Sequence, residues 1–253
     1  MEFKVESSDM DQKNIWGIIG LGWLGQALSE TLNSHGVKSW GTHRDQFDWK
    51  TDEFPQTAFD ILFLNTPPLL TMLPQAFVDK IPSNSDQRIL FVSSISVYGN
   101  QEGDIKESTL PTPHTERGRW LYAVEQLLVQ KFKERVTIIR PGGLIGGHRH
   151  PVFQLSQSHL PVAANSPINL VHRQDLIQII CVVAELAQPP QIINAVTPFH
   201  PSKENYYSTW TSKLGLAEIK FTGANEPHKI VGSEYLPKVY PHWIHPLLDT
   251  IDS

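Results

Sequence analysis

The sequence of 253 residues is poor in several features that would each indicate a particular class of protein. It holds one cysteine, Cys181, so no disulfide can form within the chain and the fold needs no oxidising compartment. No apolar stretch reaches the roughly 18 residues of a membrane span, and the N-terminus does not resemble a signal peptide. Neither sign of charge dominates, because the formal net charge is only −5. We therefore expect a cytoplasmic protein whose partners include no nucleic acid and no membrane.

The chain does contain an alternation of short apolar runs with longer segments of helical period. This alternation is typical of βαβ units on a parallel sheet. It predicts an α/β fold built on a Rossmann-type, doubly wound, mostly parallel sheet. Asp175 is expected to cap the fourth helix at its N-terminus. The predicted strands are 15–19, 37–42, 61–64, 89–93, 136–140 and 192–195, and the predicted helices are 23–34, 74–80, 117–134, 175–186 and 202–214.

The segment 141–167 interrupts this alternation. It holds four glycines, four prolines and three histidines, so we expect a loop or lobe in place of regular structure. In doubly wound sheets, such excursions at the carboxyl ends of strands form the substrate side of the cleft. The sequence therefore predicts a polar tail over 1–14 and a single domain over 15–253, with a small substrate lobe from about 141–167 and 197–253.

A glycine motif follows the first predicted strand. Gly20, Gly22 and Gly25 form G-x-G-x-x-G at the opening of a helix. The first glycine permits a sharp turn, the second lets the backbone approach a pyrophosphate, and the third lets helix and strand pack closely. The start of the helix also presents amides and a partial positive charge to that phosphate. The motif predicts that these glycines, with Trp23 and Leu24 between them, bind a dinucleotide.

The end of the second predicted strand bears on the choice of dinucleotide. An adenosine ribose is normally held by an Asp or Glu at this position. This chain has Thr42, His43 and Arg44 there. A guanidinium suits a 2′-phosphate because the two form charge-assisted hydrogen bonds. We therefore expect NADP in preference to NAD, with a solvated surface arginine as the alternative interpretation of Arg44.

Three further segments resemble the motifs of a known family. They are FVSSISVYG at 91–99, RPGGLIG at 140–146 and NLVHRQDLI at 169–177. They are similar to the strand-end serine motif, the RPG loop and the VH-x-x-D motif of the extended short-chain dehydrogenases, the NAD-dependent epimerase/dehydratase group. With GLGWLG and the G-x-H-R-H-P segment at 146–151, the combination resembles the YeeZ-like atypical branch of that superfamily. The resemblance extends over about 15–237.

The resemblance implies a function as well as a fold. It implies an NAD(P)-dependent oxidoreductase that acts on an unknown carbonyl or sugar-like small molecule. It also implies that Asn65, Thr66 and Pro141 line the cofactor. Members of the family often form dimers, and a homodimer is left open here.

The family carries out its chemistry with a Ser, a Tyr and a Lys, and this chain departs from that pattern. The serine carries over as Ser94. With Glu125 fixing the register of the helix, the tyrosine position falls on Arg117 and the lysine position on Leu121. Tyr122 has no lysine four residues later, and we interpret it as a packing residue. The loss of a general acid slows hydride transfer without abolishing it.

Two hypotheses follow from this departure. In the first, the chain is an oxidoreductase whose catalytic residues are Ser94 and Arg117, with Arg117 holding an anion or a developing oxyanion. In the second, the chain keeps the cofactor cleft but acts as a sensor or scaffold without turnover.

Histidines after the fifth predicted strand are candidates for the substrate side. His148, Arg149 and His150 are predicted to contact the substrate, with a solvated turn as the alternative. The resemblance also assigns His172 to the neighbourhood of the substrate, and the alternative is a hydrogen-bonded histidine before a helix. No third ligand at metal spacing accompanies His148 and His150, so we expect no metal.

Overall fold

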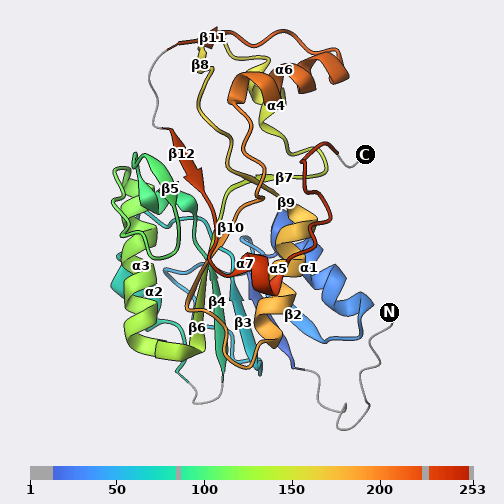
Figure 1. Ribbon diagram of the computed structural model, residues 1–253. Coiled ribbons are helices and arrows are strands. Elements are labelled where there is room, and N and C mark those ends of the chain that lie inside the picture. The colour runs from blue at the N-terminus through green and yellow to red at the C-terminus, as the bar shows by residue number, and fades with distance from the viewer. Residues whose placement is uncertain (1–13, 84–86, 224–227, 251–253) are drawn as a thin grey trace.

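A computed structural model describes residues 14–83, 87–223 and 228–250, so the predicted tail lies outside the described residues except for Asn14. Its centre is a six-stranded sheet in which all neighbouring strands are parallel (Figure 1). The direction of chain progression reverses between β1 and β3, which is the switch point where ligands bind in doubly wound folds. The strands, in spatial order, are β10 (Ile192–Ala195), β6 (Val136–Pro141), β4 (Arg88–Val92), β3 (Ile61–Leu64), β1 (Trp16–Ile19) and β2 (Ser39–Thr42).

Two hydrophobic cores lie on the two faces of the sheet, and together they explain why its central strands are apolar throughout. In β3, Ile61 and Phe63 join the core under helices α1 and α5, while Leu62 and Leu64 join the core under α2 and α3. A strand that is buried on both faces carries no polar alternation. The helices are α1 (Trp23–Ser34), α2 (Pro74–Asp79), α3 (Glu116–Phe132) and α5 (Arg173–Glu185), and α3 is followed by the short 3₁₀ turn η2 (Lys133–Arg135). The predicted α/β class is confirmed, and every predicted strand and helix is found with its ends within two residues.

A smaller lobe with a core of its own stands above the carboxyl edge of the sheet (Figure 1). Its core gathers Val152, Ile168, Tyr206 and Trp210. The expectation of no regular structure over 141–167 is wrong, since this segment contributes two short strands and a helix. The elements of this region are β7 (Gly143–Ile145), α4 (Pro151–Leu155), β8 (Val162–Ala163), β9 (Leu170–His172), α6 (Lys203–Leu214) and β11 (Phe221–Thr222), with β7 paired to β9 and β8 to β11.

The sequence assigned residues 197–253 to the lobe, but the last part of this range belongs to the sheet domain. After β11 the chain returns to the sheet domain, where β12 (Lys229–Val231) pairs with β5 (Gly103–Ile105) and α7 (Leu236–Val239) packs against β10. The short 3₁₀ turn η1 (Ile95–Tyr98) connects β4 to β5. None of the helices formed by the described residues has the length and apolar character needed to cross a membrane.

The N-terminus of α5 corrects one prediction. Its N-cap is His172, whose Nδ1 accepts a hydrogen bond from the Gln174 amide at 3.3 Å, so Asp175 is not the cap. Asp175 lies in the first turn of α5, fully buried, and accepts hydrogen bonds from the Tyr240 hydroxyl at 2.9 Å and from the Ile244 and His245 amides at 2.7 and 3.1 Å. Its carboxylate therefore holds the C-terminal segment against the sheet domain.

Candidate functional site

The three glycines of the turn have distinct structural reasons. Gly20 has a φ of +107°, and a Cβ there would lie 2.2 Å from the Asn65 carbonyl oxygen. A Cβ on Gly25 would lie 2.2 Å from the Gly20 carbonyl oxygen, so helix α1 can approach β1 only without one. A Cβ on Gly22 would meet nothing within 4 Å. Gly20 and Gly25 thus serve packing, whereas Gly22 borders open space that a ligand can enter.

The start of α1 offers backbone groups to this space. Its N-cap is Gly22, no side chain caps the helix, and its first turn holds no acidic residue. The Leu24 side chain is buried in the core, so only the backbone amide of this predicted cofactor residue is available to a ligand. Amides at an uncapped helix N-terminus favour an anion.

A cavity of about 890 Å³ opens from the glycine turn along the ends of β1, β2 and β3. It brings together five predicted cofactor residues, Gly20, Gly22, Arg44, Asn65 and Thr66. The Asn65 side chain donates to the Gly20 carbonyl at 3.1 Å, which fixes the turn against β3. The Thr66 hydroxyl oxygen is buried and has no hydrogen-bond partner among the described residues. Because a buried polar atom without a partner is costly, this orphan fits a bound polar ligand such as a dinucleotide.

A second cavity of about 300 Å³ adjoins the first, and the two share Asn65, Thr66 and Pro67. The two predicted catalytic residues, Ser94 and Arg117, both line it. Ser94 caps η1 by accepting from the Ser96 amide at 3.1 Å, which leaves its hydroxyl proton to donate. The structure therefore assembles a hydroxyl donor and a guanidinium beside the first cavity.

Two other residues of helix α3, Leu121 and Tyr122, follow Arg117 and pack against the core. Leu121, at the family's lysine position, is buried in the core and lines the second cavity. Tyr122 is half-buried and packs against the same core, as expected for a packing residue. Pro141 is buried at the end of β6. No basic side chain stands at position 121 to lower the pKa of a hydroxyl.

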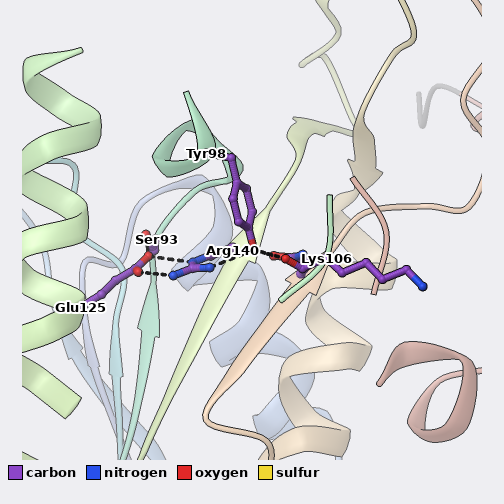
Figure 2. A network of polar contacts seen from close by, with 6 residues as sticks. Ser93, Tyr98, Lys106, Glu125 and Arg140 are labelled. Carbon is purple, nitrogen blue, oxygen red and sulfur yellow. Dashed lines mark hydrogen bonds and ion pairs between the residues drawn. The ribbon is translucent and has the colours of Figure 1, made fainter. Parts of the chain in front are cut away.

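A buried polar network reaches the second cavity at Ser93, which lines it. Figure 2 shows this network. Glu125 on α3 binds Arg140 on β6 through two hydrogen bonds of 3.1 and 2.6 Å, and it accepts a third from the Ser93 hydroxyl. Arg140 also donates to the Tyr98 hydroxyl at 2.8 Å, and that hydroxyl in turn donates to the side-chain oxygen Oδ1 of Asn194 at 2.9 Å. Burial raises the pKa of Glu125, and the hydrogen bonds from Arg140 oppose this rise. The network ties the strand end that carries the serines to α3 and β6.

The histidines of the loop after β7 separate in the structure. His148 and Arg149 are exposed, whereas His150 is buried in the lobe. The His150 ring bonds the Tyr206 hydroxyl at 2.9 Å and accepts from the Val152 amide at 3.2 Å, and burial lowers its pKa to about 4. His150 thus serves the lobe core, which corrects both the predicted substrate contact and its alternative of a solvated turn.

His172 belongs to a buried cluster with Asp175 and His245, whose candidate ligand atoms lie within 4.8 Å of one another. The centroids of the two imidazole rings are 3.6 Å apart. The His245 nitrogens already bond the Gln174 side chain at 2.8 Å and the Thr250 hydroxyl at 2.6 Å. With the Asp175 carboxylate equally engaged, the cluster fastens the C-terminal segment and does not favour a metal. The alternative interpretation of His172, a hydrogen-bonded histidine before a helix, is confirmed.

Sequence reasoning missed two groups of cations. The first is Arg173, whose guanidinium carbon lies 4.6 Å from the centre of the Trp23 ring, while that of Arg149 lies 5.1 Å from it. The second is the pair Lys203 and Lys229, which line a cavity of about 490 Å³ between the sheet domain and the lobe. Lys229 donates to the Gly99 carbonyl at 2.7 Å, and burial, with the charge of Lys203, lowers its pKa. Arg149 and Arg173 stand in the G-x-H-R-H-P and VH-x-x-D segments, but neither segment indicates that the two meet at Trp23. Lys203 and Lys229 belong to no motif described above, so in both groups only the fold brings the cations together.

Comparison with known proteins was made on sequence and on structure. Protein YeeZ of Escherichia coli strain K12 is 28% identical over 244 residues, which cover 84% of this chain and 88% of YeeZ. No protein-family model matches the chain.

Two solved structures illustrate the structural likeness. A dTDP-4-dehydrorhamnose reductase from Bacillus anthracis in complex with NADP gives a TM-score of 0.70 at 16% identity, covering 90% of this chain and 92% of that one. A UDP-glucuronic acid 4-epimerase from Bacillus cereus in complex with NAD gives a TM-score of 0.71 at 14% identity, covering 90% and 93%. Identities this low show the fold alone. Together with the similarity to YeeZ, they confirm the resemblance drawn from the sequence motifs.

Proposed function

We propose that this chain is an NAD(P)-dependent oxidoreductase of the atypical short-chain dehydrogenase type, acting on a carbonyl or sugar-like small molecule. The observation that carries the proposal is the open side of Gly22, which faces the uncapped start of α1 at the mouth of the large cavity. The buried orphan hydroxyl of Thr66, at the junction of both cavities, supports it. The turn through Gly20 and Gly22 would hold the diphosphate, Gly25 would let helix α1 lie close enough to offer its first amides, and Arg44 favours NADP over NAD.

The chemistry proposed for the second cavity uses Ser94 and Arg117. When bound, the nicotinamide supplies or accepts the hydride. The Ser94 hydroxyl donates a hydrogen bond to the substrate oxygen, and the Arg117 guanidinium stabilises the negative charge that develops there. Because a guanidinium does not release its proton near neutral pH, water in the open cavity has to supply the proton that completes the alcohol.

The cavity between Lys203 and Lys229 supports a substrate with an anionic group, such as a phosphorylated sugar. Two lysines at one cavity are stabilised by a shared anion. The Bacillus cereus epimerase described above, which has the same fold, is named for UDP-glucuronic acid.

The first experiment tests binding. Titration with NADPH and NADH, followed by calorimetry and by tryptophan quenching, should saturate. Gly22→Ala should weaken NADPH binding by about 100-fold, equivalent to ~3 kcal/mol, because the methyl group occupies the space the diphosphate needs. Its melting temperature should not change, since the added Cβ meets nothing within 4 Å. Gly232→Ala is the matched control, because that Cβ also meets nothing within 4 Å and the residue lies outside the cavity. The absence of saturable binding by the unmodified chain would refute the proposal.

The second experiment tests chemistry. Absorbance of the nicotinamide is followed with a panel of carbonyl compounds. Ser94→Ala or Arg117→Ala should lower any reductase rate by about 100-fold, the usual loss for one oxyanion donor. Unchanged rates would show that the proposed catalytic site is wrong.

The second candidate function is a non-catalytic NAD(P)-binding sensor or scaffold. It is favoured by Arg117 and Leu121 at the family's tyrosine and lysine positions, where Leu121 is built into the core. Saturable binding of NADPH without turnover of any substrate in the panel would support it.

A further inference from the structure

Two arginines from distant parts of the chain meet at one aromatic ring beside the glycine turn. Trp23, half-buried, is the first residue of α1. The guanidinium carbon of Arg149, from the loop between β7 and α4, lies 5.1 Å from the ring centre, and that of Arg173, the first residue of α5, lies 4.6 Å from it. Cations are attracted to the face of an indole. One ring therefore holds two like charges next to the start of α1.

The local backbone fixes both arginines in this place. Gly146 and Arg149 exchange two backbone hydrogen bonds of 3.0 and 3.1 Å, which close a tight turn. Gly147 has a φ of +55°, and a Cβ there would lie 3.9 Å from the Arg173 guanidinium. The glycine-rich loop thus brings its backbone close to Arg173 and presents Arg149 to the ring.

Within the part of the chain that the structure describes, no carboxylate neutralises these charges. Neither guanidinium forms an ion pair with a carboxylate of the described residues. The first turn of α1 holds no acidic residue. Asp175, two residues after Arg173, is occupied by Tyr240, Ile244 and His245. Two guanidiniums near one ring repel each other, and solvent screens this repulsion only in part, so an anion that contacts both is favoured there.

We infer that Arg149 and Arg173, aligned by Trp23, form a clamp for the diphosphate of the dinucleotide. The inference rests on the proposed function and adds to it two side chains outside the glycine motif. Arg149 comes from the loop that leads into the lobe and Arg173 from the sheet domain. Diphosphate binding would therefore also fasten the lobe loop to the start of α1.

The test measures binding, with no need for turnover. Arg149→Gln, Arg173→Gln and the double variant are titrated by calorimetry with NADPH, NADH, ADP-ribose and adenosine 2′-monophosphate. The double variant should weaken the first three ligands by about tenfold or more, because each carries the diphosphate and charge-assisted hydrogen bonds are strong. The dependence of their affinity on salt should also flatten. Adenosine 2′-monophosphate, which lacks a diphosphate, should bind as before.

Arg135→Gln is the matched control. Arg135 also lies over an aromatic ring, 5.4 Å from the centre of Phe132. It precedes β6 and so lies at the amino ends of the strands, whereas the glycine turn lies at their carboxyl ends. This control removes the same charge and should leave all four affinities unchanged. Thermal melting of each variant checks that it folds.

The outcomes separate the clamp from the proposed function. If the unmodified chain binds NADPH and the double variant binds it equally well, the clamp is wrong and the proposed function stands. If the double variant loses adenosine 2′-monophosphate as strongly as NADPH, the arginines act through general charge and the clamp is again wrong. If the unmodified chain binds no dinucleotide, both fall together.

Discussion

The two adjoining cavities of this protein differ in how fully they match the enzymes that its sequence resembles. The first cavity, proposed to hold the dinucleotide, is lined by Gly20 and Gly22 of the glycine turn and holds the orphan hydroxyl of Thr66. Ser94, Arg117 and Leu121 line the second cavity, and the sequence resemblance implies that the last two stand at the family's tyrosine and lysine positions. Yet the two share Asn65, Thr66 and Pro67, so no structural boundary separates them. The two cavities thus form one continuous cleft, in which variants can test cofactor binding and catalysis separately.

The buried network sharpens this contrast. Glu125, Arg140 and Ser93 stand directly behind the altered cavity, and their hydrogen bonds are complete. The network holds Ser93, and Ser94 follows it directly in the chain. It therefore fixes the strand end that presents Ser94 to the second cavity.

The largest expected effect comes from restoring the missing pair. The double change Arg117→Tyr with Leu121→Lys places a proton donor and a cation at the family's positions on one face of α3. It should raise the rate of carbonyl reduction by about 10²- to 10⁴-fold, the usual contribution of general acid catalysis. The measurement is the initial rate of NADPH oxidation across the carbonyl panel, with the NADPH dissociation constant measured in parallel.

Leu121→Lys alone is the control for this experiment, because it introduces the charge without the proton donor. It should give little of the gain. If the double variant folds and binds NADPH but shows no increase in rate, the second cavity does not hold a carbonyl substrate. That result would contradict the oxidoreductase hypothesis and favour the sensor.

The second expected effect concerns stability. Glu125→Gln leaves the Arg140 guanidinium buried without its counter-charge, and both side chains are only 1% exposed. The free energy of unfolding should fall by about 3 to 5 kcal/mol, as for other broken buried ion pairs. Urea denaturation measures this loss. Replacing both partners, Glu125→Leu with Arg140→Met, should recover much of it, because no unpaired charge then remains. If both variants lose the same stability, the shape of the network matters more than its charges.

Much of the sheet domain could be predicted because its strands are buried on both faces. Such strands appear in the sequence as continuous apolar runs, and the glycine turn marks the start of the first helix. The lobe could not be predicted in the same way. Its strands are two or three residues long, too short to show a period, and they pair with segments far along the chain.

The candidate site shows the same limit. The glycine turn and Arg44 follow predicted strands at fixed spacings, and Ser94 lies in a segment that resembles a family motif, so local sequence predicted that all three belong to a cleft. His150 stands in a polar, glycine-rich loop, and its burial depends on Tyr206, which lies 56 residues away. Arg173 meets Trp23 across 150 positions of sequence. Contacts of this kind are made by the tertiary fold and leave no local pattern.

The smallest expected effect tests the choice of dinucleotide within the better preserved cavity. Arg44 lines that cavity two residues after the end of β2, and the carboxylates of Asp45 and Asp48 line it as well, so the variant tests which group selects the nucleotide. Arg44→Gln should weaken NADPH binding by about tenfold, because a 2′-phosphate loses its charge-assisted hydrogen bonds, and should leave NADH binding nearly unchanged. Calorimetry with both nucleotides measures the ratio, and NADH serves as the internal control. Equal losses for both would mean that Arg44 acts through general charge, and no loss for either would mean that it is a solvated arginine. In both cases the preference for NADP would have no basis in this strand end, and the cavity would be selective for the diphosphate alone.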